Sequence, residues 1–263
     1  YGDGNHNIFI GKYSGGLNFH GLLDEIAIYN RSLNLTEIQE HYNSSDHYSS
    51  GGAADGIGDA CDCGNDGLCT AAAYCVGQQT YDADCDYDSD GVYDSTDNCV
   101  SVSNADQNDT DGSSNSCPLN GMIGYWEADG NVNDATGARN GTLNNGATYA
   151  TGKLDQAFSF DGSNDYVTVA DDASLQLTND FSVEFWVKRA STADPAPDLP
   201  ALVNKYKSGT GGWLINLGRS TLCGNGVISV YEGSGWDCSS LAISDTDWHH
   251  VAVTVSSLGN DYV

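Results

Sequence analysis

The middle of the chain, residues 44–120, cannot build a hydrophobic core. It has few large apolar side chains and many Asp, Gly, Ser and Cys residues. No Lys or Arg lies between Arg31 and Arg139, although this interval holds more than half of the 37 acidic residues. A dense run of carboxylates without cations repels itself. Order in this part of the chain must therefore come from bound cations and disulfides.

The two flanks have a different character. In residues 1–43 and 121–263, apolar and polar residues alternate in short runs that are separated by turn residues. These runs predict strands at 7–11, 22–29, 122–126, 157–160, 166–169, 182–188, 212–217, 226–231 and 249–255. Strands at such spacing indicate an all-β sandwich. In the first flank, Asn34 followed by Glu37 predicts a capped helix over 32–42.

The formal net charge of -28 disfavours two classes of function. Nucleic-acid binding needs a basic face, and so does docking to an anionic membrane. No apolar run approaches the roughly 18 residues that a membrane span requires. Seven of the nine cysteines fall between Cys61 and Cys117, a density typical of an oxidising compartment. We therefore expect an extracellular or cell-surface protein that neither binds nucleic acid nor inserts into a membrane.

The positions of the cysteines along the chain predict two disulfides and leave the pairing of the other cysteines undecided. Cys99–Cys117 and Cys223–Cys238 are the natural pairs. Spacing cannot choose among the remaining five, Cys61, Cys63, Cys69, Cys75 and Cys85. A structural zinc site is the rival interpretation, but the region lacks Cys-x-x-Cys pairs and offers His47 no suitable partner.

The segment 86–97 has the spacing of a calcium loop. If Asp86 is position 1, carboxylates stand at positions 1, 3, 5, 9 and 12, a glycine stands at position 6, and the Val92 carbonyl fills position 7. Oxygen ligands at this charge favour Ca²⁺ over transition metals. The predicted ligands of this loop are Asp86, Asp88, Asp90, Val92, Asp94 and Asp97.

Residues 55–117 as a whole resemble thrombospondin type 3 repeats, through Asp-x-Asp-x-Asp-Gly, Asp-Asn-Cys and a following run of Asn, Asp and Gln. The resemblance implies a chain that wraps successive calcium ions with little regular secondary structure. It implies a second set of ligands at Asn104, Asp106, Asp109 and Asp111, and an earlier half-repeat with Asp55 and Asp59. Residues 63–85 depart from the pattern, as an insertion with its own cysteines.

The flanks resemble two parts of one fold, in reversed order. Residues 121–263, with Gly124-Tyr-Trp126, Phe181-Ser-Val-Glu184-Phe-Trp186 and Trp248-His-His-Val251, resemble the opening of a laminin G-like, concanavalin A-like jelly roll. Residues 1–43, with Ile8-Phe-Ile10-Gly11 and Gly21–Asn30, resemble the end of the same domain. The resemblance therefore implies a jelly-roll sandwich plus an irregular connector over 44–120. The two parts could close within one chain or between chains, or could belong to one period of a tandem array.

Candidate sites outside the connector are fewer. Asp24, Asp129 and Asp134 stand where jelly rolls of this kind can hold a structural calcium. Trp213, Tyr231 and Trp236 could form a sugar-stacking face, or could be aromatics that pack in the core or against a disulfide. Glu184 is the lone carboxylate on its strand, without the second carboxylate that glucanases of this fold use, so we expect no enzyme. Sequons for N-glycosylation occur at Asn30, Asn34, Asn43, Asn108 and Asn140.

These observations support two hypotheses for the function. The first is a calcium-stabilised extracellular structural protein. In it, residues 1–43 of one copy complete residues 121–263 of the next, and the copies build a head-to-tail filament or array. The second is an adhesin or carbohydrate-binding module of a secreted protein, with glycans as partners.

Overall fold

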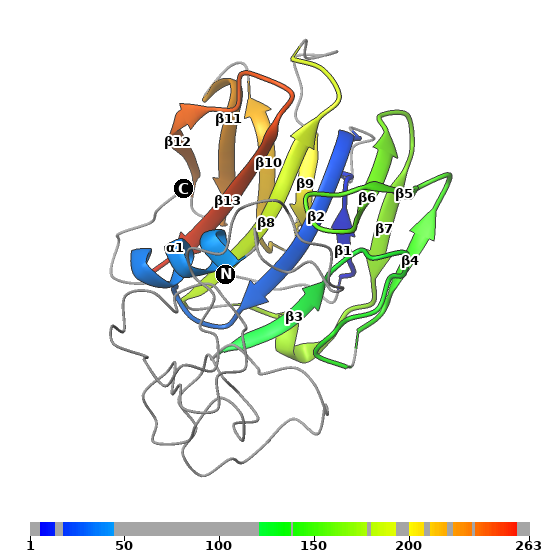
Figure 1. The fold of residues 1–263 in the computed structure, drawn as a ribbon. Helices are drawn as coiled ribbons and strands as arrows, with labels where there is room; N and C mark the ends of the chain where they lie inside the picture. The colour runs from blue at the N-terminus through cyan, green and yellow to red at the C-terminus, as the bar shows by residue number, and fades with distance from the viewer. Residues whose placement is uncertain are drawn as a thin grey trace, which may run out of the picture. The chain divides into compact units, whose positions relative to one another are not determined.

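The computed structural model describes residues 6–13, 18–44, 121–137, 139–177, 180–192, 200–207, 211–219, 223–232 and 235–256. The chain divides into two compact units, residues 1–38 with 121–263 and residues 39–120. The first unit is an antiparallel β-sandwich (Figure 1). The predicted calcium ligands of the connector, between Asp55 and Asp111, lie outside the described residues, as do the Cys99–Cys117 pair and Asn108.

One sheet has seven strands in the order β12-β11-β10-β9-β1-β7-β4. The bounds are β1 Ile8–Ile10, β4 Gly141–Asn144, β7 Tyr166–Val169, β9 Ala201–Asn204, β10 Leu214–Arg219, β11 Gly224–Tyr231 and β12 Trp236–Ala242. The other sheet follows the order β13-β8-β2-β6-β5, and β3 pairs with β2. Its bounds are β2 His20–Tyr29, β3 Met122–Trp126, β5 Thr148–Thr151, β6 Gln156–Asp161, β8 Phe181–Arg189 and β13 Trp248–Val255. A 3-10 turn spans Ala173–Leu175.

The N-terminal strands occupy central positions in both sheets. β1 pairs with β7 on one side and with β9 on the other. β2 pairs with β8 along one edge and with β6 and β3 along the other. Figure 1 shows the two blue strands among strands that come much later in the chain. The sandwich described by this structure therefore closes within one chain.

A bulge in β2 explains how this strand contributes to the core. The register with β8 shifts between Asp24 and Ala27, and Glu25 has a φ of 52°. The extra residue resets the alternation, so that Leu23 and Ile26 are both fully buried although they are three positions apart. They pack in one cluster with apolar side chains from both sheets, among them Ile8, Ile10, Ile28, Trp126, Phe158, Phe185 and Ile215.

The helix α1, Leu35–Ser44, begins three residues later than the sequence analysis placed it. The Asn34 side chain accepts hydrogen bonds from the backbone N–H groups of Thr36 and Glu37, at 2.9 and 3.1 Å. The Glu37 carboxylate in turn accepts one from the Asn34 N–H, at 2.7 Å. This reciprocal cap leaves Ser32 and Leu33 outside the helix.

Candidate functional site

A row of side chains crosses the outer face of the seven-stranded sheet. Trp236 stands opposite Tyr231, and Tyr231 stands opposite Leu214. Leu214 stands opposite Asn204, and Asn204 stands opposite Phe9. The neighbours of these residues along their strands, such as Ile8, Ile10, Ile215 and Val230, belong to the core. By alternation the row itself faces away from the core, although Leu214 and Asn204 in its middle are buried.

Aromatic rings cluster at both ends of this row. At one end the Tyr206 and Tyr231 ring centroids are 5.0 Å apart, and the Tyr231 and Trp236 centroids are 5.2 Å apart. At the other end Phe9 lies 6.0 Å from Tyr166 on the adjacent strand. All five rings are partly exposed. The outer face therefore presents two aromatic clusters, whose outermost members, Trp236 and Phe9, are four strand spacings or about 19 Å apart.

A buried amide lies between the two aromatic clusters. The Asn204 side chain is fully buried. It donates to the Lys12 carbonyl oxygen at 3.3 Å and accepts from the Tyr206 N–H at 2.7 Å. The Lys12 ammonium lies 3.9 Å from the centre of the Tyr166 ring. These contacts hold the ends of β1 and β9 together, and so fix the positions of the rings on either side.

The structure separates the three aromatics that the sequence grouped as a possible sugar-stacking face. Trp213 is 2% exposed and packs against Phe181, with ring centroids 5.7 Å apart, so it is a core residue. Tyr231 and Trp236 lie on the outer face, beside the Cys223–Cys238 disulfide, which the structure contains. Phe9, Tyr166 and Tyr206 complete the face and were not predicted. Strand alternation could have identified Phe9 as a residue that faces away from the core, because it stands between the core residues Ile8 and Ile10.

The bulge of β2 brings acidic side chains together at another place. Asp24 is fully buried and accepts hydrogen bonds from the N–H groups of Lys153 and Leu154, at 2.8 and 3.1 Å. Gly152 allows this close approach, because a Cβ there would lie 2.6 Å from the Asp24 carboxylate. Glu25 accepts a hydrogen bond from the Tyr125 hydroxyl.

Burial and mutual repulsion raise the pKa values in this acidic cluster. Burial, followed by repulsion from Asp129, raises the pKa of Asp24 to about 7. Burial, followed by repulsion from Asp24, raises the pKa of Glu25 to about 9. Burial also raises the pKa values of Glu127 and Asp129. Asp24 and Glu25 therefore keep their protons to higher pH than ordinary carboxyl groups do. Within the described ranges, no three His, Cys, Asp or Glu side chains are grouped so that they could hold a metal ion.

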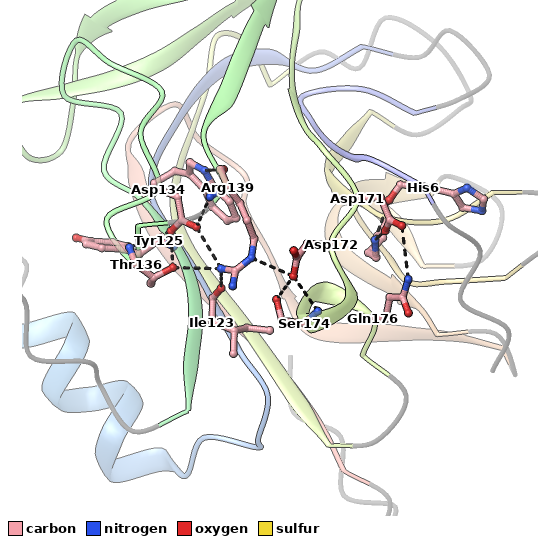
Figure 2. Close-up of polar contacts among 12 residues, drawn as sticks. His6, Ile123, Tyr125, Asp134, Thr136, Arg139, Asp171, Asp172, Ser174 and Gln176 are labelled. Atoms are coloured by element: carbon pink, nitrogen blue, oxygen red, sulfur yellow. Dashed lines mark hydrogen bonds and ion pairs between the residues drawn. The ribbon is translucent and has the colours of Figure 1, made fainter. Parts of the chain in front are cut away.

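Asp134, the other acidic residue suggested for the jelly roll, has different partners. It accepts hydrogen bonds from the Tyr125 N–H at 3.0 Å and from the Thr136 hydroxyl at 2.7 Å. It also pairs with the Arg139 guanidinium at 3.2 Å. Arg139 reaches Asp172 with its Nε, 3.4 Å away, as Figure 2 shows. Asp134 therefore fixes the chain around it through protein contacts.

Glu184, the lone carboxylate of β8, is buried. It is 4% exposed and accepts a hydrogen bond from the Tyr29 hydroxyl at 2.5 Å. The His250 Nε2 lies 3.7 Å from its other oxygen. Burial and the Glu184 charge raise the pKa of Tyr29. Val183 and Phe185, the neighbours of Glu184 in β8, belong to the core, so Glu184 lies on the other side of its sheet, where β2 brings Tyr29 beside it.

Three predicted glycosylation sites lie on the described surface. Asn30, Asn34 and Asn140 are exposed. The Asn34 and Asn140 side-chain oxygens accept backbone hydrogen bonds, Asn140 from the Asp134 N–H at 3.0 Å. Asn43 lies in α1. Modification at these positions stays a prediction.

Residues 161–262 match the family described as the concanavalin A-like lectin/glucanases superfamily. The sandwich is a concanavalin A-like jelly roll. The match begins at the last residue of β6 and includes β7 to β13, and the structure adds β1 and β2 from the other end of the chain. Comparison with curated proteins and with solved structures finds no match. None of the described helices is long and apolar enough to cross a membrane.

Proposed function

We propose that the protein is a non-catalytic carbohydrate-binding module of an extracellular protein, and that its ligand lies across the outer face of the seven-stranded sheet. The observation that carries the proposal is the row from Trp236 to Phe9, with partly exposed rings at both ends. Aromatic faces bind the C–H faces of sugar rings, and the buried Asn204 amide fixes the strand ends that carry the rings. The superfamily that residues 161–262 match includes lectins and glucanases by its description.

The chemistry of the row favours binding over hydrolysis. Hydrolysis of glycosidic bonds generally requires a pair of carboxyl groups that flank the bond. The row comprises Trp236, Tyr231, Leu214, Asn204 and Phe9, and none of these is a carboxylate. Glu184 lies in β8 of the other sheet and is buried against Tyr29. The net charge of -28 favours neutral over acidic polysaccharides.

Binding should depend on the rings of the row. In affinity gel electrophoresis with β-glucan, xylan and galactomannan, we expect at least one neutral polysaccharide to retard the protein. Trp236→Ala and Tyr231→Ala should each weaken that binding by about tenfold or more, since buried aromatic anchors dominate binding energies. No reducing ends should be released during incubation.

Trp248→Ala is the matched control, because Trp248 is also partly exposed but belongs to β13 of the other sheet. It should bind like the wild type. The proposal is wrong if no polysaccharide binds, or if the Trp236 and Trp248 variants lose equal affinity.

Head-to-tail assembly into an extracellular filament is the second candidate function. The observation that favours it is the central position of β1 and β2, which belong to a segment that precedes the long connector. A chain whose N-terminal strands entered a neighbouring sandwich would form an open, heterologous array.

Calcium is the cofactor that we propose for the connector, on the spacing of Asp86, Asp88, Asp90, Asp94 and Asp97. Removing Ca²⁺ with EGTA should speed cleavage of the connector by an Asp-specific protease at least several-fold, because freed carboxylates repel one another. Trypsin is unsuitable, since no Lys or Arg lies between Arg31 and Arg139. Restored Ca²⁺ should restore protection and Mg²⁺ should not. Equal cleavage with and without Ca²⁺ would contradict the proposal.

A further inference from the structure

The segment 6–33, here called the donor segment, supplies the centre of the sandwich. In β1, Ile8 and Ile10 are fully buried between β7 and β9. In β2, Leu23, Ile26 and Ile28 are fully buried beside β8. Without this segment, each sheet would have an open slot between strands that do not otherwise pair, with the apolar core exposed.

Polar contacts tie the donor segment to the rest of the sandwich at several points. The Lys205 ammonium donates to the His6 carbonyl at 2.7 Å. The Ser182 hydroxyl accepts from the Leu33 N–H at 2.8 Å, and the Ser32 hydroxyl donates to the Val255 carbonyl at 2.8 Å. These partners recur in every copy of the chain, so a second copy offers an identical slot.

No disulfide can lock the donor segment into its own sandwich. Residues 1–44 contain no cysteine, and the first cysteine of the chain is Cys61. The segment is covalently joined to the remaining strands only through the residues between Leu33 and Met122. Every other connection within the described part of the chain is a backbone pairing, a polar contact or apolar packing. All of these can form equally well between two chains.

We infer that the donor segment of one copy can complete the sandwich of a second copy. The contacts are the same in both arrangements, so concentration decides between them. The tether gives the segment an effective concentration of at most about millimolar order for its own slot. At micromolar protein, closure within one chain therefore dominates, and exchange requires crowded chains or a blocked segment. This inference rests on the second candidate function and is independent of carbohydrate binding.

A mixing experiment with two full-length variants tests the exchange. Ile28→Asp places a charge in the donor segment, while the slot of that chain stays intact. Val183→Asp places a charge in the slot, directly opposite Ile28, while the donor segment of that chain stays intact. Both side chains are fully buried, so neither variant should fold alone. Refolded together, the two chains should form a heterodimer with one complete sandwich.

The readouts are the thermal transition by near-ultraviolet circular dichroism and the mass by light scattering. The equimolar mixture should recover about half of the wild-type transition amplitude at twice the monomer mass. Thr36→Asp and Thr148→Asp, both at exposed positions, are the matched controls and should fold alone as monomers. The inference is overturned if the mixture shows no transition, or if either core variant alone shows the wild-type transition. Loss of exchange would leave the polysaccharide-binding result unchanged, so the two proposals fail separately.

Discussion

Replacing Leu23 by alanine is expected to destabilise the sandwich by about 2–5 kcal/mol, as for other fully buried leucines. Leu23 lies in β2, opposite Val187 of β8 and Phe158 of β6, and its side chain is fully buried. Truncation removes apolar contacts and leaves a cavity between two sheets that other strands hold in place. Urea unfolding followed by tryptophan fluorescence measures the change.

Leu22→Ala is the matched control. Leu22 precedes Leu23, points to the other side of the sheet and is only partly buried. Its truncation should cost less than about 1 kcal/mol. Equal effects of the two substitutions would show that β2 does not occupy this register. If residues 1–43 stayed outside the sandwich, neither Leu22→Ala nor Leu23→Ala would lower its stability.

Local sequence pattern was sufficient to locate most strands. Alternation predicted β3 and β7 at their observed bounds, and predicted β1, β8 and β13 to within a residue or two. Four strands were missed. β4 and β5 are only four residues long, and β9 is a short run directly after Pro200. β12 has an exposed, polar pattern at a sheet edge, where burial imposes no alternation.

The relations between distant segments could be inferred only from the family resemblance. The local sequence Ile8-Phe9-Ile10 does not indicate which strands it pairs with. In the structure Ile10 stands opposite both Val167 of β7 and Val203 of β9. The resemblance identified residues 1–43 as the missing part of the jelly roll, but left open which chain they complete. The structure closes the sandwich within one chain.

The candidate site was only partly predictable for the same reason. Tyr231 and Trp236 were grouped from the sequence as part of a possible sugar-stacking face, whereas Phe9 joins them only because β1 enters the middle of the sheet. Alternation could have separated Trp213 from them, because Trp213 has the same parity as Ile215 and Leu217 in the predicted strand 212–217, and all three lie in the core. The acidic cluster depends on the bulge at Glu25, for which the sequence gives no signal.

The acidic cluster makes stability fall as pH rises. Burial raises the pKa of Asp24 in the folded state from its ordinary value of 3.8 to about 7. Below about pH 4 the Asp24 carboxyl is protonated in both the folded and the unfolded chain, so it does not change the free energy of unfolding. As pH rises from about 4 to 7, the unfolded chain ionises while the folded chain keeps its proton, which favours unfolding. Glu25, with a pKa of about 9, extends the same trend to higher pH.

We therefore expect Asp24→Asn to flatten the pH profile of stability between pH 5 and 8. The wild type should lose a few kcal/mol over this range, because each unit of pKa difference corresponds to about 1.4 kcal/mol. The asparagine oxygen can still accept from the Lys153 and Leu154 N–H groups, so the variant should be the more stable protein at pH 8. Urea unfolding at each pH measures both curves.

Glu25→Gln, which retains an acceptor for the Tyr125 hydroxyl, should flatten the profile further when combined with Asp24→Asn. Asp245→Asn is the control, since the hydrogen bond from His249 lowers the pKa of that exposed carboxylate. It should leave the slope between pH 5 and 8 nearly unchanged. All the variants keep His249 and His250, so their differences from the wild type isolate the carboxyl groups. A wild-type slope in the double variant would show that the β2 bulge does not hold protons.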